Sequence, residues 1–230
     1  MKFQSLVAPV LALAVSAATA ETERSQYGDQ DLWVLSSAWQ PETCQGSTAN
    51  ACVEPTPFMA SHLTIESLVP RYNDGRFQDP LCRYTYGTFL RNNIDKAGRD
   101  DLRKYWPVLT APNITNTWTG DISIEHPDTP EYDWTCSGLD QAPYLSAALS
   151  LAKMVGTPAL IANNIGGEVT AQKLRQATKA TLKCNNGSLA KVITCWAKHP
   201  KKFVPTNQIA CPATVAKDTC TSDNVLIRSF

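Results

Sequence analysis

The stretch HLTIESLVPRYNDGRF, residues 62–77, carries more information about the fold than any other part of the 230-residue chain. Apolar and polar residues alternate along its first half, as they do in a strand. The alternation places Ile65 on one face, and Glu66 and Leu68 on the other. Asp74-Gly75 then provides a turn signal. The stretch predicts a strand that ends in a turn.

Further elements are expected on both sides of this strand. The pattern predicts strands over 31–39 and 188–197, one or two helices over 84–105 with a break near Gly98, and helices over 144–155 and 170–183. Trp106-Pro107 is expected to end the helical region over 84–105, because proline does not continue a helix. Thr170 is a candidate N-cap. The sequence therefore predicts an α+β fold.

The N-terminus has the pattern of an export signal. Lys2 precedes an apolar run, and Ala18-Thr19-Ala20 is a small-residue cleavage site. We therefore expect residues 1–20 to be a signal peptide and residues 21–230 to be a single secreted domain with no membrane span. All eight cysteines follow the signal, which favours disulfides, although spacing alone leaves their pairing undetermined.

The balance of acidic and basic residues argues against tight binding to a nucleic-acid backbone. Lys+Arg and Asp+Glu both number 21, so the chain lacks the basic excess that is typical of tight binding to a nucleic-acid backbone. The cysteines form no C-x-x-C pair, and we expect neither a metal nor a cofactor. Two sequons, at Asn113 and Asn186, predict glycosylation on surface loops.

Several motifs, taken in order, resemble those of the ribonuclease T2 family. WQPETC (39–44) is similar to that family's W-P-x-x-y-C, and LTIESLVPRYNDGRFQDPLC (63–82) is similar to F-T-I-H-G-L-W-P followed by N-D-G-x-Y-P and a cysteine. LRKYWPVL (102–109) resembles the family's helix that ends in W-P. Trp118 and TCS (135–137) resemble the two ends of its second active-site segment. The resemblance implies a central antiparallel sheet with surrounding helices, stapled by disulfides.

The resemblance also implies how the cysteines pair. The implied bridges are Cys44–Cys52, Cys82–Cys136, Cys184–Cys220 and Cys195–Cys211. Together they use all eight thiols, which is consistent with an exported protein.

Members of this family cleave RNA by moving the 2′-hydroxyl onto the adjacent phosphorus. That chemistry needs a base, an acid and a cation, and the family supplies them with two histidines, a glutamate and a lysine. In this chain the first histidine position is Glu66, and the family's base-stacking tryptophan is Val69. Arg71 stands where an acidic base-contacting residue is common, and Phe77 keeps an aromatic ring. Arg71 and Phe77 are therefore the candidate substrate-binding residues.

The second active-site segment also departs from the family pattern. Alignment from Trp118 puts the family's glutamate at Asp121, its lysine at Ile124 and its histidine at Glu125. Alignment back from Cys136 puts the lysine at Tyr132 and the histidine at Asp133. Under both alignments the phosphate-holding cation is missing. His126 is a candidate displaced histidine, although its proline-rich surroundings are typical of a surface loop, and His62 and His199 have surface positions.

These replacements lead to three hypotheses. The first is a catalytically inactive, monomeric, secreted protein that binds RNA, a nucleotide or a protein partner, and that acts as an effector. The second is an active endoribonuclease that forms a 2′,3′-cyclic phosphate with His126 and either Glu66 or Asp121. The third is a secreted storage or structural protein.

Overall fold

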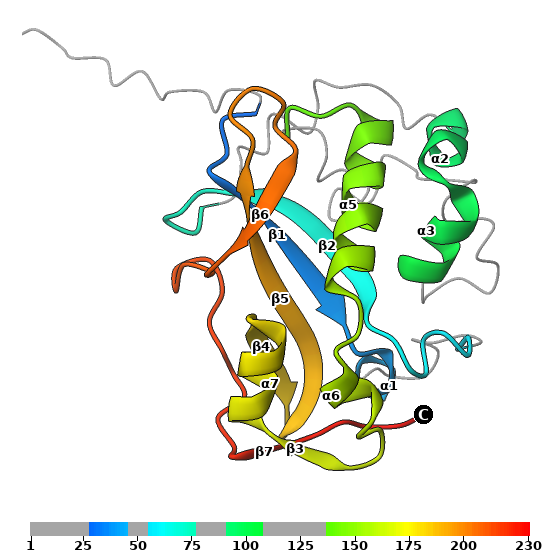
Figure 1. Cartoon of the computed structure of the whole chain (residues 1–230), viewed down its shortest axis with the longest axis vertical. Coiled ribbons are helices and arrows are strands. Elements are labelled where there is room, and N and C mark those ends of the chain that lie inside the picture. The colour runs from blue at the N-terminus through cyan, green and yellow to red at the C-terminus, as the bar shows by residue number, and fades with distance from the viewer. Residues whose placement is uncertain (1–27, 46–54, 77–90, 108–136) are drawn as a thin grey trace, which may run out of the picture.

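The computed structural model describes residues 28–45, 55–76, 91–107 and 137–230, and Figure 1 shows a sheet with helices packed against it. The elements in chain order are β1 (Leu32–Ala38), α1 (Gln40–Thr43), β2 (Thr64–Arg71), α2 (Arg91–Ala97), α3 (Arg99–Tyr105), α5 (Gln141–Val155), α6 (Ala159–Ala162), β3 (Glu168–Thr170), α7 (Ala171–Thr178), β4 (Thr181–Asn185), β5 (Ser188–Lys198), β6 (Pro205–Ile209) and β7 (Asn224–Leu226). This mixture confirms the α+β fold class.

The sheet is built around β1 and β5. Within the described ranges it has seven strands in the order β2-β1-β5-β7-β3, and β4 and β6 also pair with β5. β1 is antiparallel to both β2 and β5, and β5 is antiparallel to β4 and β6. The contact between β5 and β7 is parallel. The expected central antiparallel sheet is therefore present, with one parallel contact near its edge.

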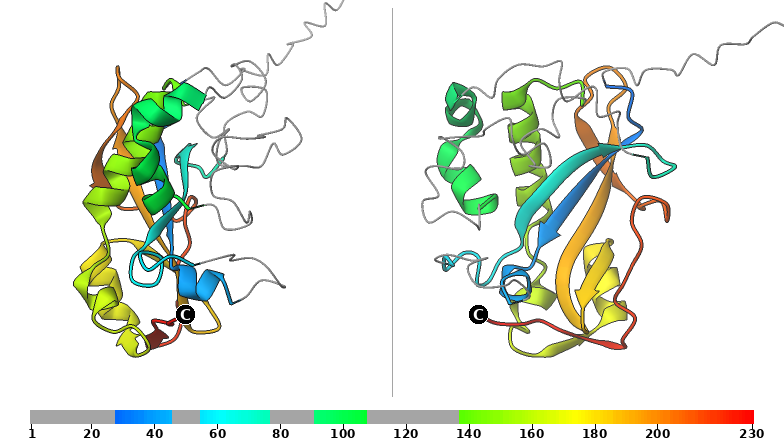
Figure 2. Two further views of the ribbon diagram at one scale, coloured as in Figure 1. Left: turned by 90° about the vertical axis from the view of Figure 1, so that its right-hand side faces the viewer. Right: turned by 180° about the vertical axis from the view of Figure 1, so that it is seen from behind.

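Three helices, α2, α3 and α5, lie on one face of the sheet (Figure 2). The apolar stripe of α5 faces the strands as its spacing predicts, and Tyr144 and Ala148 are fully buried there. The Tyr144 hydroxyl donates to the carbonyl oxygen of Leu68 on β2 at 2.6 Å. The packed core thus lies between α5 and the β2-β1-β5 part of the sheet.

The helical region before α5 has the predicted break. Gly98 has φ 106°, a conformation that favours glycine, and it separates α2 from α3. α3 ends at Tyr105, immediately before Trp106-Pro107, as predicted. The part of the predicted region before residue 91 lies outside the described residues.

The predicted helix over 170–183 is wrong in its second half. Thr170 does cap α7, because its hydroxyl accepts from the Lys173 N–H at 3.4 Å. The helix ends at Thr178, where Lys179 takes a left-handed φ of 49°, and β4 follows. Asn186 and Gly187 both have positive φ and form a two-residue hairpin turn between β4 and β5. β4 and this Asn-Gly turn therefore replace the predicted helix after Thr178.

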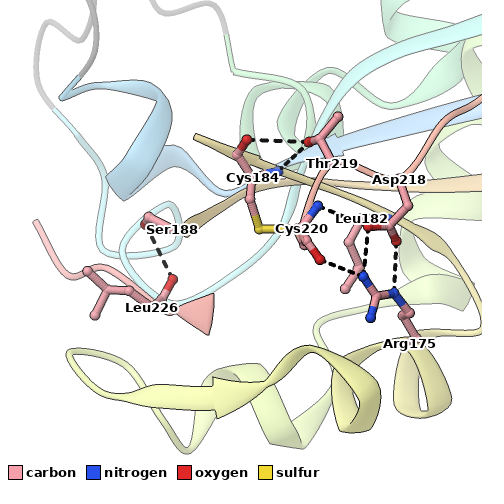
Figure 3. Close-up of a disulfide and its surroundings, with 8 residues drawn as sticks. All are labelled: Arg175, Leu182, Cys184, Ser188, Asp218, Thr219, Cys220 and Leu226. Carbon is pink, nitrogen blue, oxygen red and sulfur yellow. Dashed lines mark hydrogen bonds and ion pairs between the residues drawn. A yellow bond between two sulfur atoms is a disulfide. The ribbon is translucent and has the colours of Figure 1, made fainter. Parts of the chain in front are cut away.

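Disulfides staple the C-terminal part of the chain to the sheet. Two predicted bridges are present: Cys184–Cys220 and Cys195–Cys211. Figure 3 shows the first, beside the Arg175–Asp218 ion pair. Cys44 is also disulfide-bonded, but its predicted partner Cys52 and the predicted pair Cys82–Cys136 lie outside the described residues.

The described helices do not meet the requirements of a membrane span. None of those in the described ranges combines the length and hydropathy that crossing a bilayer demands. The predicted signal peptide over 1–20 lies outside the described residues.

Candidate functional site

Glu66 occupies a β-bulge in β2. Ser36 of β1 is opposite Ser67, and Ser37 is opposite Ile65, so Glu66 is an extra residue with no opposite number in β1. Because of the bulge, the predicted alternation is wrong for Leu68. Leu68 does not share a face with Glu66; it lies with Ile65 in the core under α5. A bulge of this kind changes the direction of a side chain, and here it turns the Glu66 carboxylate to the face of the sheet away from α5.

Two side chains from neighbouring strands hold this carboxylate. Ser36 Oγ on β1 donates to Glu66 Oε2 at 2.6 Å, and Lys191 Nζ on β5 lies 2.5 Å from Glu66 Oε1. We call Ser36, Glu66 and Lys191 the Glu66 cluster. The side chains of Glu66 and Lys191 are 36% and 37% exposed, so solvent still reaches the pair. The cluster therefore joins three strands at the surface rather than in the core.

This arrangement limits the chemistry that Glu66 can perform. Each carboxylate oxygen already accepts from a donor, so a 2′-hydroxyl would have to share an oxygen with Ser36 or Lys191. The ionised carboxylate also has no proton to give to a leaving group. Lys191 is the nearest cation, but its charge is balanced by Glu66. The cluster is thus a structural ion pair placed where the resemblance implies a catalytic histidine.

Sequence reasoning missed Ser36 and Lys191. A signal for Lys191 was present, because it is a charged residue in the middle of the apolar run LAKVITCW in β5. The residue directly opposite Lys191 in β4 is Lys183, which lies on the same face of the sheet. Two directly opposed lysines repel each other, and Glu66 offsets part of that repulsion. Only the strand order reveals this, because β2 and β5 are far apart in the sequence.

Arg71 lies at the end of β2 and holds the turn that follows. Its guanidinium Nη1 donates to the Gly75 carbonyl oxygen at 3.1 Å. Within the turn, the Arg76 backbone N–H and guanidinium both donate to Asp74, and they hold the pKa of that carboxyl below its usual value. The contact that is seen for Arg71 is therefore with the turn, and base contact stays a prediction.

The two described histidines have local partners. The His62 ring stacks on Phe58, with centroids 4.1 Å apart and planes 8° from parallel. His199 Nδ1 accepts from the backbone N–H groups of Lys201 and Lys202 at 3.1 Å, which organises a loop. These contacts give neither ring a place in the Glu66 cluster.

Other predicted site residues lie outside the described ranges. These are Phe77, Asp121, Glu125 and His126, together with the sequon at Asn113. The second sequon places Asn186 at the exposed hairpin turn, while Ser188 is buried and donates to the Leu226 carbonyl oxygen. Among the described residues, no group of three or more His, Cys, Asp or Glu side chains has a metal-binding arrangement.

Comparisons with known structures show the same fold in ribonucleases. The chain is similar to RNase NT in complex with 5′-AMP, at 21% identity and a TM-score of 0.66 over 88% of this chain and 100% of that one. It is also similar to an RNase-related protein from Calystegia sepium, at 21% identity and a TM-score of 0.57 over 86% and 97%. A Nicotiana alata self-incompatibility-associated ribonuclease matches at 21% identity and a TM-score of 0.62 over 87% and 100%.

The sequence comparisons match a family model but no individual curated protein. A comparison with curated protein sequences finds no significant match. The model of the ribonuclease T2 family matches residues 30–220, which is most of the chain. The chain therefore belongs to the ribonuclease T2 family.

Proposed function

We propose that this protein is a secreted, catalytically inactive member of its family that acts by binding RNA or a nucleotide without cleaving it. The observation that carries the proposal is the Glu66 cluster. At the position that the resemblance aligns with the first catalytic histidine, the chain has a carboxylate whose two oxygens are each in contact with a donor, Ser36 and Lys191.

The argument for inactivity is chemical. Attack of the 2′-oxygen on phosphorus with departure of the 5′-oxygen needs a group that takes the 2′ proton, a group that protonates the 5′-oxygen and a cation on the phosphate. The loss of a single member of such a unit costs orders of magnitude in rate. Glu66 replaces one histidine, and the second segment lacks both a matching histidine and the lysine. A fold can persist after its chemistry is lost.

The argument for a nucleotide ligand rests on the fold and on charge. A solved member of this structural group, RNase NT, is described in complex with 5′-AMP, and we extend that ligand class to this chain. The equal numbers of acidic and basic residues favour a nucleotide or a short single-stranded segment over tight binding along a long backbone. The predicted signal peptide and the disulfides support export. Export together with the replaced catalytic residues supports an effector role.

RNA cleavage by the purified, disulfide-intact protein tests this proposal. The protein is incubated with RNA from about pH 4 to about pH 8, the range over which histidine and carboxylate catalysts change protonation. We expect no cyclic-phosphate product at any pH. The variants Glu66→Ala and His126→Ala are assayed in parallel, and near-ultraviolet circular dichroism verifies that each protein is folded.

Cleavage that is lost in either variant would contradict the proposal. It would show instead that the protein is an endoribonuclease with a relocated site. Cleavage that persists in both variants would be followed through a further purification step. Activity that co-purifies with the protein would also contradict the proposal, whereas activity that separates from it belongs to a contaminating enzyme.

A further inference from the structure

The loop that precedes β2 lies near the C-terminal end of α3 (Figure 1). Aromatic rings and lysines from these two segments and α5 meet in a cluster that shares no residue with the Glu66 cluster. We call it the Phe58 patch. The Phe58 ring meets the Tyr105 ring edge-on, with centroids 5.0 Å apart and planes at 74°. His62 stacks on Phe58. Lys104 and Lys153 place their ammonium groups 4.8 Å from Phe58 and 5.7 Å from Tyr105, respectively. The patch is thus a set of rings with cations at its border.

The outermost ring of the patch, His62, is held in a fixed orientation. Its Nδ1 lies 2.8 Å from Ser61 Oγ and 3.2 Å from the Phe58 carbonyl oxygen. The residue is exposed, whereas Phe58 and Tyr105 are partly buried beneath it. A flat ring that is already oriented loses little conformational entropy when a second flat group stacks on it. His62 therefore presents a prepared stacking surface to solvent.

The charges at the patch favour an anion beside that surface. Lys153 is paired with Asp101 at 2.6 Å, so its charge is balanced. Lys104 has no acidic partner within the described residues, and its ammonium lies 4.8 Å from Phe58 and 5.3 Å from Tyr105. It is also exposed. The patch therefore combines one unbalanced cation with a stacking face.

We propose that the Phe58 patch binds single-stranded RNA, with a base stacked on His62 and a phosphate held by Lys104. Proteins that bind single strands without sequence preference combine the same two elements, aromatic rings for the bases and cations for the backbone. The inference rests on the proposed function, because it gives a binding protein a contact surface. It does not depend on the Glu66 cluster, since the two groups share no residue.

A purely structural role explains the buried part of the patch but not its exposed part. Tyr105 packs against the core beneath α5, and Phe58 contacts it. The exposed His62 ring and the exposed Lys104 add little to that core. Removal of His62 should therefore leave the fold intact, which makes the inference testable.

The test measures binding of fluorescein-labelled 2′-O-methyl oligoadenylate by fluorescence anisotropy with the full, disulfide-intact protein. This oligonucleotide lacks the 2′-hydroxyl that cleavage requires, so binding is measured independently of any catalysis. We expect His62→Ala to weaken binding about 5- to 100-fold, the cost of losing one stacking surface. His62→Phe keeps a flat ring on Phe58 and should retain binding.

Lysine variants test the second half of the inference. Lys104→Ala should weaken binding and lower the salt dependence, because one phosphate contact is lost. Lys96→Ala is the matched control: Lys96 is an exposed lysine on the neighbouring α2, and its replacement removes the same charge without touching the patch. It should leave binding unchanged.

Three results would overturn the inference: no binding of the oligonucleotide, equal binding by His62→Ala, or equal losses from Lys96→Ala and Lys104→Ala. The first would also count against RNA as the ligand in the proposed function, whereas the other two would overturn the patch alone. Failure of the proposed inactivity gives a different signal, which is cleavage of unmodified RNA.

Discussion

Single residues in the turn after β2 show how closely the backbone of this protein is packed. Gly75 has φ +86°, and a Cβ at this position would overlap the carbonyl oxygen of Thr214. The Thr214 hydroxyl also donates to the Asn73 carbonyl oxygen at 2.5 Å. The turn is thereby attached to a loop that is distant in the sequence, and glycine at position 75 serves both the turn conformation and this contact.

Replacement of Gly75 by alanine tests the contact. Gly166→Ala is the control, because Gly166 has a similar φ of +82° but no atom within 4 Å of the place that a methyl group would take. The control should cost about 1–2 kcal/mol for its backbone conformation alone. Gly75→Ala should cost a further ~1–3 kcal/mol for the overlap. Urea unfolding measures both, and equal losses would show that the turn does not pack on Thr214 as described.

At the scale of elements, the C-terminal segment is tied to α1 and to its N-cap residue, Trp39. The indole N–H of Trp39 donates to the Arg228 carbonyl oxygen at 2.8 Å. The Arg228 guanidinium lies 2.6 Å from Glu42, whose side chain is only 8% exposed. A buried carboxylate without its partner is costly, so this ion pair should matter more than a surface pair does.

Two arginine variants test whether the contribution of an ion pair to stability depends on its burial when its length is the same. Arg228→Met leaves Glu42 without its cation and should lower the free energy of unfolding by about 1–3 kcal/mol. Arg76→Met removes an ion pair of the same 2.6 Å length whose side chains are 73% and 52% exposed. It should cause no measurable loss. Chemical denaturation of both variants provides the comparison, and similar losses would argue against a special role for burial.

At the scale of the whole molecule, the C-terminal part depends on one carboxylate beside a disulfide (Figure 3). Asp218 accepts from the Arg175 guanidinium at 2.9 Å and 3.0 Å, and from the backbone N–H groups of Leu182 and Cys220. Partial burial acts to raise the pKa of Asp218, but these hydrogen bonds outweigh it, and the pKa lies below its usual 3.8. The ionised carboxylate therefore joins α7, β4 and the segment that carries Cys220.

The lowered pKa makes a signed prediction about acid stability. A group whose pKa is lower in the folded state stabilises that state above its unfolded pKa, and this contribution is lost as the pH falls through the folded value. The stability difference between the wild type and Asp218→Asn should be constant above about pH 5 and should shrink below pH 3.8. Urea midpoints measured across this range under non-reducing conditions test it, and a difference that grows on acidification would contradict the assignment.

Local patterns were sufficient for several elements and for the family. The apolar stripe of α5, the break at Gly98 and the Thr170 cap depend on residues within one or two turns of each other, so the sequence alone predicts them. The turn at Asn186-Gly187 was equally local, and it was missed because the helical spacing before it extended too far.

The contacts of the Glu66 cluster join residues that are far apart in the sequence, so no local pattern predicts them. From the sequence alone we predicted the α+β class, the family and two of the disulfides, and the resemblance aligned Glu66 with a family histidine. The bulge that turns Glu66 away from α5, and the Ser36 and Lys191 side chains that hold it, come from three strands whose order is set by tertiary packing. A carboxylate's chemistry depends on what surrounds it, and for Glu66 only the tertiary structure decided those surroundings.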